Sequence, residues 1–497
     1  MFRDYTELFT LKHPEEFYIG GEWVKPRGSG RFEIVYPATE KVVGSCPAAS
    51  VEDIERAVAA ARDAFDNGPW VRMTFDERAD VLERAGQIMT AKAAAFGDAW
   101  TAQIGCARSL SGPGGHSAGA IFGYYAQMVR GRTFEEVRPQ SRKAGVGIVV
   151  KEPVGVVAAI TPWNAPSSLP CKIIAPALAN GCAVIHKPAP ETPLDAWLLA
   201  ECLEEAGLPA GIFNIVPADR EVGDHLVRHP GVDKVSLIGS AAAGRHIASV
   251  VGGRLGRFSL ELGGKSPAII FDDIDPAVVV PRLIPHFTMN AGQMCAGLTR
   301  IVVPEESKDK WAGAIAAGLE ALKVGDPFEQ DTWFGPIAMK RQYDRVMGYF
   351  DVARDEGAQV VTGGGRPSDL NQGYYVAPTL LAGTNDMRVA REEIFGPVAT
   401  LITHKGVEDA IRIANDTEYG LNGAVYTSDP DLAYKVSRRV RAGNMTHNDW
   451  VNDIQFPFGG FKNSGIGRDG GPEGLALYQE TKVVFMDAVP QSVHPVA

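Results

Sequence analysis

The chain has 497 residues, enough for about two to four domains, and its 49 Lys and Arg against 60 Asp and Glu give a formal net charge of −11. A composition with 45% hydrophobic and 22% charged residues is ordinary for a globular protein and excludes disorder, collagen and coiled coil as descriptions of the whole chain. The acidic balance argues against a nucleic-acid or anionic-membrane partner, because phosphate groups are bound by clustered Lys and Arg.

The N-terminal residues and the cysteines point to the cytosol. Residues 1–17 carry too many charges for the apolar core of a signal peptide, and no run of about 18 apolar residues predicts a spanning helix. The six cysteines are scattered without a CxxC pair, which suits neither a disulfide framework nor a zinc site. We therefore expect a cytoplasmic protein without a metal, whose typical cysteine is a small buried hydrophobe.

The first 150 residues predict helices and then an excursion from the domain body. Apolar residues at helical spacing predict a helix over 51–66 and a second, longer helical region over 76–104. The stretch 127–151 is basic and rich in turn residues, and it closes on a β-branched run. This pattern favours a hairpin arm.

Residues 152–240 alternate apolar runs with helical segments. The runs lack polar alternation, as is typical of parallel strands covered on both faces. They lie at 154–160, 183–187, 213–217 and 234–239. The helical segments end near Ala179 and span about 193–206 and 221–229. Successive β–α–β units of this kind predict a doubly wound parallel sheet.

A second β/α alternation follows a Gly-rich junction at 260–267. Its strand-like runs lie at 266–273, 299–306, 358–364 and 398–405, and its helical segments at 307–322 and 337–357. This second alternation of strand-like and helical segments predicts a second α/β domain. A last strand-like run, 476–489, lies beyond both, and as an edge strand it would need a partner, which another subunit could supply.

Polar and Gly-rich segments follow the strands of the first set. Ligands of open α/β sheets bind at the carboxyl ends of strands, where helix N-termini and loop amides face them. Here these ends carry TPWN at 161–164, Lys187, and GSAAAG at 239–244. They favour a nucleotide's ribose and phosphates, with plain turn chemistry as an equal alternative. The GxGxxG pattern at 465–470 follows no strand, and we interpret it as a chance match in a loop.

Five short segments are more specific, because they occur in a characteristic order. They are TPWNAP at 161–166, LELGGKSP at 260–267, GQMCAGLTR at 292–300, EEIFGPV at 392–398 and PFGGFKNSGIGR at 457–468. Together they resemble the aldehyde dehydrogenase superfamily over about residues 18–485. The resemblance implies an α/β fold with a Rossmann-like coenzyme-binding domain, an α/β catalytic domain and a small β oligomerisation arm. The implied coenzyme-binding domain comprises 1–127 and 152–260, and the implied catalytic domain 261–470. The implied arm comprises 128–151 and 471–497.

The resemblance implies NAD(P)-dependent oxidation of an aldehyde to a carboxylic acid. Cys295 is the implied nucleophile, which forms a thiohemiacetal and then a thioester. Glu261 is the implied base that activates water, and its presence indicates the hydrolytic, non-acylating type, since relatives that transfer the acyl group to coenzyme A commonly lack it. Asn164 is the implied oxyanion donor, together with the backbone N–H of Cys295, and a helix N-cap is its alternative role.

The implied cofactor is NAD, with NADP possible. Lys187 would bind the adenosine ribose, Ser240 and the amides after Gly239 the pyrophosphate, and Glu393 and Phe395 the nicotinamide ribose and ring. The further implied cofactor residues are Ile160, Thr161, Pro162, Trp163, Gly223, Gly244 and Leu262. Many NAD-preferring members have a Glu where this chain has Pro190, one residue before Glu191, which leaves NADP open.

The implied substrate tunnel departs from the family pattern. Lys172 occupies a place that is often aromatic in relatives, and Ala165 and Ser168 are small where bulkier residues are common. The other candidates for substrate contact are Met294, Trp450, Phe456 and Phe458, and core packing is an equal alternative for the three aromatic residues. His225 and His229 lie four apart on a predicted helix, where we expect a solvated face rather than a metal site.

Two other functions stay open. A cysteine hydrolase without a redox cofactor also forms a thioester, but it needs a His that activates Cys295, and no His has an evident assignment. A structural, crystallin-like family member would keep the fold without turnover, which the presence of Cys295, Glu261 and Asn164 argues against. The expected partners are an aldehyde and further copies of the chain, as a homodimer or a homotetramer built as a dimer of dimers.

Overall fold

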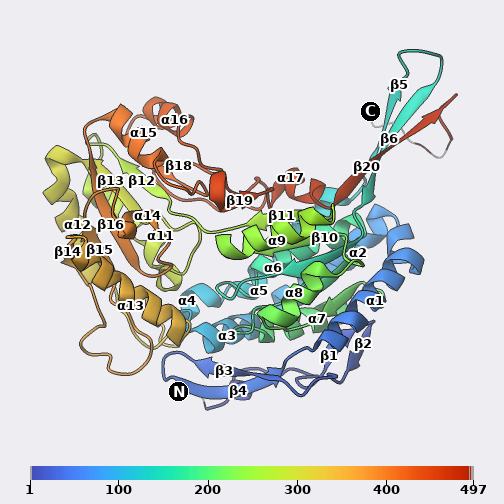
Figure 1. The fold of residues 1–497 in the computed structure, drawn as a ribbon, viewed down its shortest axis with the longest axis horizontal. Coiled ribbons are helices and arrows are strands. Elements are labelled where there is room, and N and C mark those ends of the chain that lie inside the picture. Colours follow the sequence, from blue (N-terminus) through green and yellow to red (C-terminus); the bar gives the residue numbers. More distant parts are fainter. Residues whose placement is uncertain (1–2, 492, 494–497) are drawn as a thin grey trace.

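A parallel sheet with helices on both faces occupies the centre of the computed structural model, which describes residues 3–491 and 493 (Figure 1). Its strand order is β19-β11-β10-β7-β8-β9, and β7 to β11 run parallel. The bounds are β7 Val156–Ile160, β8 Ala183–Lys187, β9 Phe213–Ile215, β10 Lys234–Ile238, β11 Arg257–Glu261 and β19 Gly465–Ile466. The four predicted strands and the doubly wound sheet are confirmed. From β7 the chain adds β8 and β9 on one side and then returns to β10 on the other, so the order reverses between β7 and β10.

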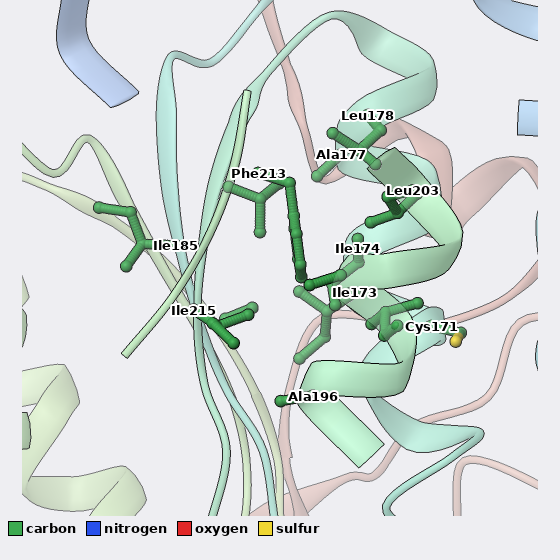
Figure 2. Packing of buried hydrophobic residues seen from close by; sticks show 14 of the residues in the cluster. Cys171, Ile173, Ile174, Ala177, Leu178, Ile185, Ala196, Leu203, Phe213 and Ile215 are labelled. Atoms are coloured by element: carbon green, nitrogen blue, oxygen red, sulfur yellow. The ribbon is translucent and has the colours of Figure 1, made fainter. Parts of the chain in front are cut away.

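Helices cover both faces of this sheet. Helices α6 and α7 pack against β7, β8 and β9, while α1 contacts the same strands and has α8 beside it. In Figure 2, Ile173 and Ile174 of α6 lie between the helices and the strand that carries Phe213 and Ile215. Burial on both faces explains why the strands read as continuous apolar runs.

The helices of this part agree with the predicted ones except in one respect. Their bounds are α1 Val51–Asn67, α2 Phe75–Ala91, α3 Ala93–Ile104, α4 Arg108–Ser111, α5 Gly114–Val129, α6 Leu169–Asn180, α7 Leu194–Glu205, α8 Arg220–Arg228, α9 Ala241–Gly253 and α17 Gly471–Ala476. The helical region predicted over 76–104 consists of two helices, α2 and α3, instead of one. At Lys92 the backbone has φ −96° and ψ 16°, so α2 ends there and α3 begins.

A second sheet, to the left in Figure 1, has the order β14-β15-β16-β13-β12-β17-β18. Its strands are β12 Pro267–Ile270, β13 Arg300–Pro304, β14 Gln359–Thr362, β15 Thr379–Ala382, β16 Val398–His404, β17 Ala424–Tyr426 and β18 Thr446–His447. The accompanying helices are α10 Pro276–Leu283, α11 Pro285–Thr288, α12 Lys308–Glu320, α13 Lys340–Asp355, α14 Arg388–Arg391, α15 Val407–Asn415 and α16 Pro430–Ser437. The predicted runs are confirmed as β12, β13, β14 and β16, whereas β15, β17 and β18 were not predicted.

An antiparallel three-stranded arm projects from the rest (Figure 1). It consists of β5 Glu135–Pro139, β6 Val146–Pro153 and β20 Gln479–Met486. The predicted hairpin is thereby confirmed. The last strand has the partner that it was expected to need: β20 pairs with β6 of the same chain along all its residues, not with another subunit, which sequence analysis had left open.

The remaining strands form two N-terminal hairpins that were not predicted. They are β1 Phe17–Ile19 with β2 Glu22–Val24, and β3 Arg31–Tyr36 with β4 Lys41–Pro47. The domain boundaries given above stay predictions, and residues 1–2, 492 and 494–497 of the predicted coenzyme domain and arm lie outside the described residues. Within the described part of the chain, no helix has the length and apolar character that crossing a membrane requires.

Candidate active site

A cavity of about 450 Å³ opens where the strand order reverses, at the carboxyl ends of β7, β10 and β11. Its wall combines residues that follow these strands with residues from the second sheet's part of the chain. Of the predicted site residues, it contains Pro162, Trp163, Asn164, Gly239, Ser240, Glu261, Leu262, Cys295, Glu393 and Phe395. Segments more than 200 residues apart in sequence therefore meet in one place.

Cys295 follows a strained turn. Asn290, Ala291 and Gly292 have φ of 52°, 53° and 70°, and left-handed backbone at two residues other than glycine costs about 1–3 kcal/mol each. All six cysteines are free, and Cys295 is the one that is not fully buried. Desolvation raises the pKa of its thiol to about 12, and the nearby carboxylates of Glu393 and Glu261 add to this.

Hydrogen bonds fix both the side-chain amide and the backbone carbonyl of Asn164 beside this turn. Its side-chain Nδ2 donates to the carbonyl oxygen of Gln293 at 2.9 Å. Its own carbonyl accepts from Trp100 Nε1 at 3.1 Å and from Asn290 Nδ2 at 2.9 Å. Helix α6 begins only at Leu169, and Asn164 caps no helix, so the N-cap alternative is wrong. The amide instead points at the loop that carries Cys295.

Glu261 ends β11 with its carboxylate in the protein interior. Both carboxylate oxygens are buried and make no hydrogen bond to any described residue. Desolvation, and next the charge of Asp469, raise the pKa of Glu261 well above its ordinary value, while the charges of Lys172 and Arg468 oppose this shift. A buried carboxyl that lacks donors and has a raised pKa is suited to accept a proton.

The GxGxxG segment contributes to the surroundings of Glu261. Gly465 and Ile466 form β19, which pairs antiparallel with the end of β11 and places Gly465 opposite Glu261. The interpretation as a chance match to the dinucleotide fingerprint stays a prediction, whereas the placement in a loop is wrong for Gly465 and Ile466, which form β19. The segment also supplies Asp469, whose pKa desolvation raises to about 6, and which sequence analysis did not single out.

Lys187 ends β8 at the carboxyl edge of the sheet and is not part of the cavity wall, which α9 reaches through its cap Ser240 and Ala241. Lys187 is buried, and its Nζ donates to the carbonyl oxygens of Pro188 and Ala218, both at 2.9 Å. Desolvation lowers the pKa of this lysine to about 8. A Cβ at Gly223 would lie 3.0 Å from Lys187 Cδ, so glycine leaves room for the lysine. Ser240 caps α9, and its Oγ accepts from the amide of Ala243 at 3.3 Å.

Glycines also allow close packing next to the cavity. A Cβ at Gly244 would lie 2.6 Å from Leu262 Cδ1, and one at Gly263 would collide with the carboxylate of Glu393. Glu393 accepts from the amide of Gly264 at 3.0 Å, and desolvation raises the pKa of Glu393 to about 7. These close contacts require glycine at both positions, because a Cβ would collide with the side chain opposite.

Phe395 is fixed by residues that sequence analysis missed. It has φ of 60°, and its ring meets that of Trp163 edge to face, with centroids 5.3 Å apart. Gln342 of α13 donates to the carbonyl oxygens of Ile394 and Phe395, at 3.0 and 2.9 Å. Arg345, three residues further on, donates to the carbonyl of Glu393 at 2.6 Å. Their spacing on one helix face was visible in the sequence, but their target was not.

The other predicted cofactor and substrate residues have varied surroundings. Ile160 and Thr161 are buried at the end of β7, where Thr161 Oγ1 lies 2.9 Å from His186 Nε2. Ala165 packs against the apolar cluster around Trp100, and Ser168 and Met294 are half-buried. Ile160 is the register partner of Lys187 on β8, so this end of β7 lies beside that lysine.

The aromatic residues before the GxGxxG segment differ in burial. Phe456 is 65% exposed, so core packing is wrong for this residue. Trp450 and Phe458 are half-buried, and the Trp450 ring lies 5.6 Å from that of His286. The Phe458 ring lies beneath the ammonium group of Lys172, at 5.1 Å.

His225 and His229 face a carboxylate. Their Nε2 atoms lie 2.6 and 3.3 Å from the carboxylate oxygens of Glu55 on α1. Across the described residues, no group of three or more His, Cys, Asp or Glu side chains is arranged to hold a metal ion. The pair therefore joins α8 to α1.

Comparison with known proteins identifies this arrangement. A model of the aldehyde dehydrogenase family matches residues 23–484. The chain belongs to the aldehyde dehydrogenase family. Geranial dehydrogenase from Castellaniella defragrans is 41% identical over 479 residues, 96% of this chain and 99% of that protein.

Solved structures of the family superpose along nearly the whole chain. An aldehyde dehydrogenase of Mycobacterium tuberculosis complexed with NAD⁺ has a TM-score of 0.93 and 40% identity, and the match covers 98% of this chain and 100% of that one. A mutant of aldehyde dehydrogenase C from Pseudomonas syringae with NAD⁺ and octanal has a TM-score of 0.92 and 36% identity, covering 96% and 98%. The α/β family fold implied by the five sequence motifs is thereby confirmed.

Proposed function

We propose that this chain oxidises an aldehyde to a carboxylic acid with NAD as hydride acceptor, through an acyl group held on Cys295. The observation that carries the proposal is the single cavity whose wall contains Cys295, Asn164, Glu261 and the predicted nicotinamide contacts Glu393 and Phe395. A thiol, an amide donor and a buried carboxylate are the groups that thioester formation and hydrolysis need.

The residues around the cavity fit NAD. Lys187 would hold the adenosine ribose, and the N-terminus of α9 at Ser240 would hold the pyrophosphate, since a helix N-terminus attracts anions. Glu393 would accept from the nicotinamide ribose, beside the ring of Phe395. NAD supplies the hydride acceptor when bound.

In the first step, Cys295 attacks the carbonyl carbon and forms a thiohemiacetal. Asn164 has a second amide hydrogen besides the one given to Gln293, and that hydrogen and the N–H of Cys295 make no other bond to the described residues. Both would stabilise the oxygen that becomes negative. Because burial disfavours the Cys295 thiolate, the thiol proton needs an acceptor, and the unpartnered carboxylate of Glu261 borders the same cavity.

In the last step, water releases the acid from the thioester. Once it has released the thiol proton to solvent, Glu261 takes a proton from the water that attacks the acyl carbon. It passes this proton to the departing sulfur, which restores the thiol of Cys295. The raised pKa of Glu261 makes its carboxylate a stronger base than an exposed one. This assigns the chain to the hydrolytic rather than the acyl-transferring type.

A panel of aldehydes with NAD and with NADP, followed by the absorbance of the reduced nicotinamide, tests the proposal. We expect reduction with at least one aldehyde, and loss of about 10⁴-fold or more in kcat/KM for Cys295→Ala with NAD binding retained. Turnover retained in Cys295→Ala would refute the nucleophile. A cysteine hydrolase would release acid from thioesters without nicotinamide reduction, and no His lies in the cavity wall to serve it. A structural family member would show no burst of reduced nicotinamide.

We propose in addition that the chain forms homo-oligomers through the arm. The end of β20 exposes apolar side chains of Val483, Val484, Phe485 and Met486, which are 38–70% accessible. An exposed apolar strand of this kind marks a protein–protein contact. A reducing, cytosolic location is part of the same proposal, supported by six cysteines that are all free.

A further inference from the structure

Lys172 has an unusual place in a buried helix. From Pro170 to Asn180, every residue of α6 is buried except Lys172, which is half-exposed. The helix begins shortly after Asn164 and packs against the first sheet through its apolar side chains (Figure 2). Lys172 is therefore the one charged residue of a largely apolar helix, and it lies in the first turn of that helix.

The ammonium group of Lys172 has no carboxylate partner. Its Nζ lies 3.4 Å from Asn452 Oδ1 and 5.1 Å from the centre of the Phe458 ring. Among the described residues, no carboxylate comes within ion-pair distance of it. Its charge acts on the carboxylates of Glu261 and Asp469, which lie beyond that distance.

The charge of Lys172 reaches the reacting groups. It lowers the pKa of Cys295, Glu261 and Asp469, each against a larger upward shift from burial. The contact residue Phe458 directly precedes Gly459, where a Cβ would collide with Glu261 Oε1. Lys172 does not line the cofactor cavity. It therefore approaches the reacting groups from the side of the predicted substrate contacts, which include Phe458.

We infer that Lys172, assisted by the amide of Asn452, binds a carboxylate at the far end of the aldehyde substrate. The preferred substrates are then short aldehydes with a terminal carboxylate, and aldehydes with a positive charge are disfavoured. The inference rests on the proposed aldehyde oxidation.

The donors of Lys172 and Asn452 match one carboxylate. Lys172 can donate through its free N–H groups, and Asn452 Nδ2 makes no hydrogen bond to a described residue. These two donors suit the two oxygens of a singly charged carboxylate, whereas a phosphate of charge near −2 would keep most of its charge uncompensated. An apolar aldehyde would leave the ammonium without a charged partner.

The test compares aldehydes of equal length and different charge. The probes are 4-oxobutanoate and 5-oxopentanoate, neutral butanal and pentanal, and the cationic trimethylammonioacetaldehyde, each with saturating NAD. We expect kcat/KM for the carboxylates to exceed that for the neutral aldehydes about tenfold or more, chiefly through a lower KM, since the contact lies away from the reacting carbon. Lys172→Met should abolish this ratio, and Lys172→Glu should invert it in favour of the cation.

A matched variant separates this effect from a general loss of a lysine. Lys310→Met removes an exposed lysine that also lies over an aromatic ring, that of Trp311 at 5.7 Å, on α12. We expect its ratio to equal that of the unchanged chain. In the unchanged chain, glutarate should inhibit butanal oxidation competitively with the aldehyde, and trimethylammonium should not.

Three results would overturn the inference: a ratio near one in the unchanged chain, a ratio insensitive to Lys172→Met, or no inhibition by glutarate. Absence of nicotinamide reduction with every aldehyde, neutral ones included, would instead overturn the proposed function.

Discussion

Glu261 and Cys295 both lie where burial opposes their charged forms. Desolvation is the largest cause of the raised pKa in each. The negative charge of Glu261 raises the pKa of Cys295 further, and that of Asp469 raises the pKa of Glu261. If the thiol passes its proton to the carboxylate, the site holds one negative charge. A thiolate beside an ionised carboxylate would place two charges there. The same environment that makes Glu261 a good base thus keeps Cys295 protonated until substrate is present.

Replacing Glu261 by Gln should separate the two halves of the reaction. The amide keeps the shape of the side chain but accepts no proton, so hydrolysis of the thioester should slow by about 10²–10⁴-fold. A burst of reduced nicotinamide is expected, itself slower than in the unchanged chain because Glu261 also accepts the thiol proton. A still slower steady rate follows, with the acyl mass found on Cys295 by mass spectrometry. Glu33→Gln, an exposed residue of β3, serves as the control. An unchanged steady rate would show that another group activates the water.

The pH dependence should report the same carboxyl group. Glu261 acts as a base only when ionised, and its pKa lies well above that of an ordinary carboxyl. The rate of thioester hydrolysis should therefore fall as the pH drops through this raised pKa, at a higher pH than an exposed Glu would give. The measurement is kcat against pH with a substrate for which hydrolysis limits the rate. If kcat of Glu261→Gln falls over the same acidic pH range, the group that titrates there is not Glu261.

At the scale of elements, α13 connects the two ends of the cofactor cavity. Its residues Gln342 and Arg345 hold the backbone of 393–395, at the nicotinamide end. Arg341 of the same helix forms an ion pair with Glu191, with Nη2 and Oε1 2.5 Å apart. Glu191 follows β8 four residues after Lys187, and its charge acts on that lysine. This carboxylate lies close to where the adenosine ribose is expected.

Glu191→Gln should increase the relative use of NADP. The carboxylate repels the 2′-phosphate, and removal of like-charge repulsion is worth about tenfold or more in the NADP to NAD ratio of kcat/KM. Binding of the reduced cofactors, followed by their fluorescence, provides a readout independent of turnover. Asp355→Asn, an exposed residue at the end of α13, is the control. An unchanged ratio would mean that Glu191 has no part in cofactor preference.

At the scale of the molecule, two sheets and an arm have separate tasks. The first sheet supplies Asn164, Ser240 and Glu261 from its carboxyl edge, and the chain of the second sheet supplies Cys295 and Glu393. The arm stands apart from this cavity and carries exposed apolar side chains on both faces of β20, since successive residues alternate between faces.

Phe485→Asp should weaken association between chains without disrupting the fold. Phe485 is 70% exposed in one chain, so the charge costs little there, but a charge buried in an apolar interface costs several kcal/mol. Light scattering after gel filtration should show a smaller species than the unchanged chain. Val360→Asp, at an exposed apolar position of β14, is the matched control. If both variants keep the mass of the unchanged chain, the arm does not mediate association.

What the amino-acid sequence determined by itself was local. Apolar runs predicted β7 to β10 because buried parallel strands need no polar alternation, and five ordered motifs predicted the family, Cys295, Glu261 and Asn164. The tertiary structure alone decided which other distant segments meet: Asp469 and β19 with Glu261, α13 with Phe395, and Lys172 with Phe458 and Asn452. These contacts depend on long-range pairing and on burial from several elements at once, which no short stretch of sequence encodes.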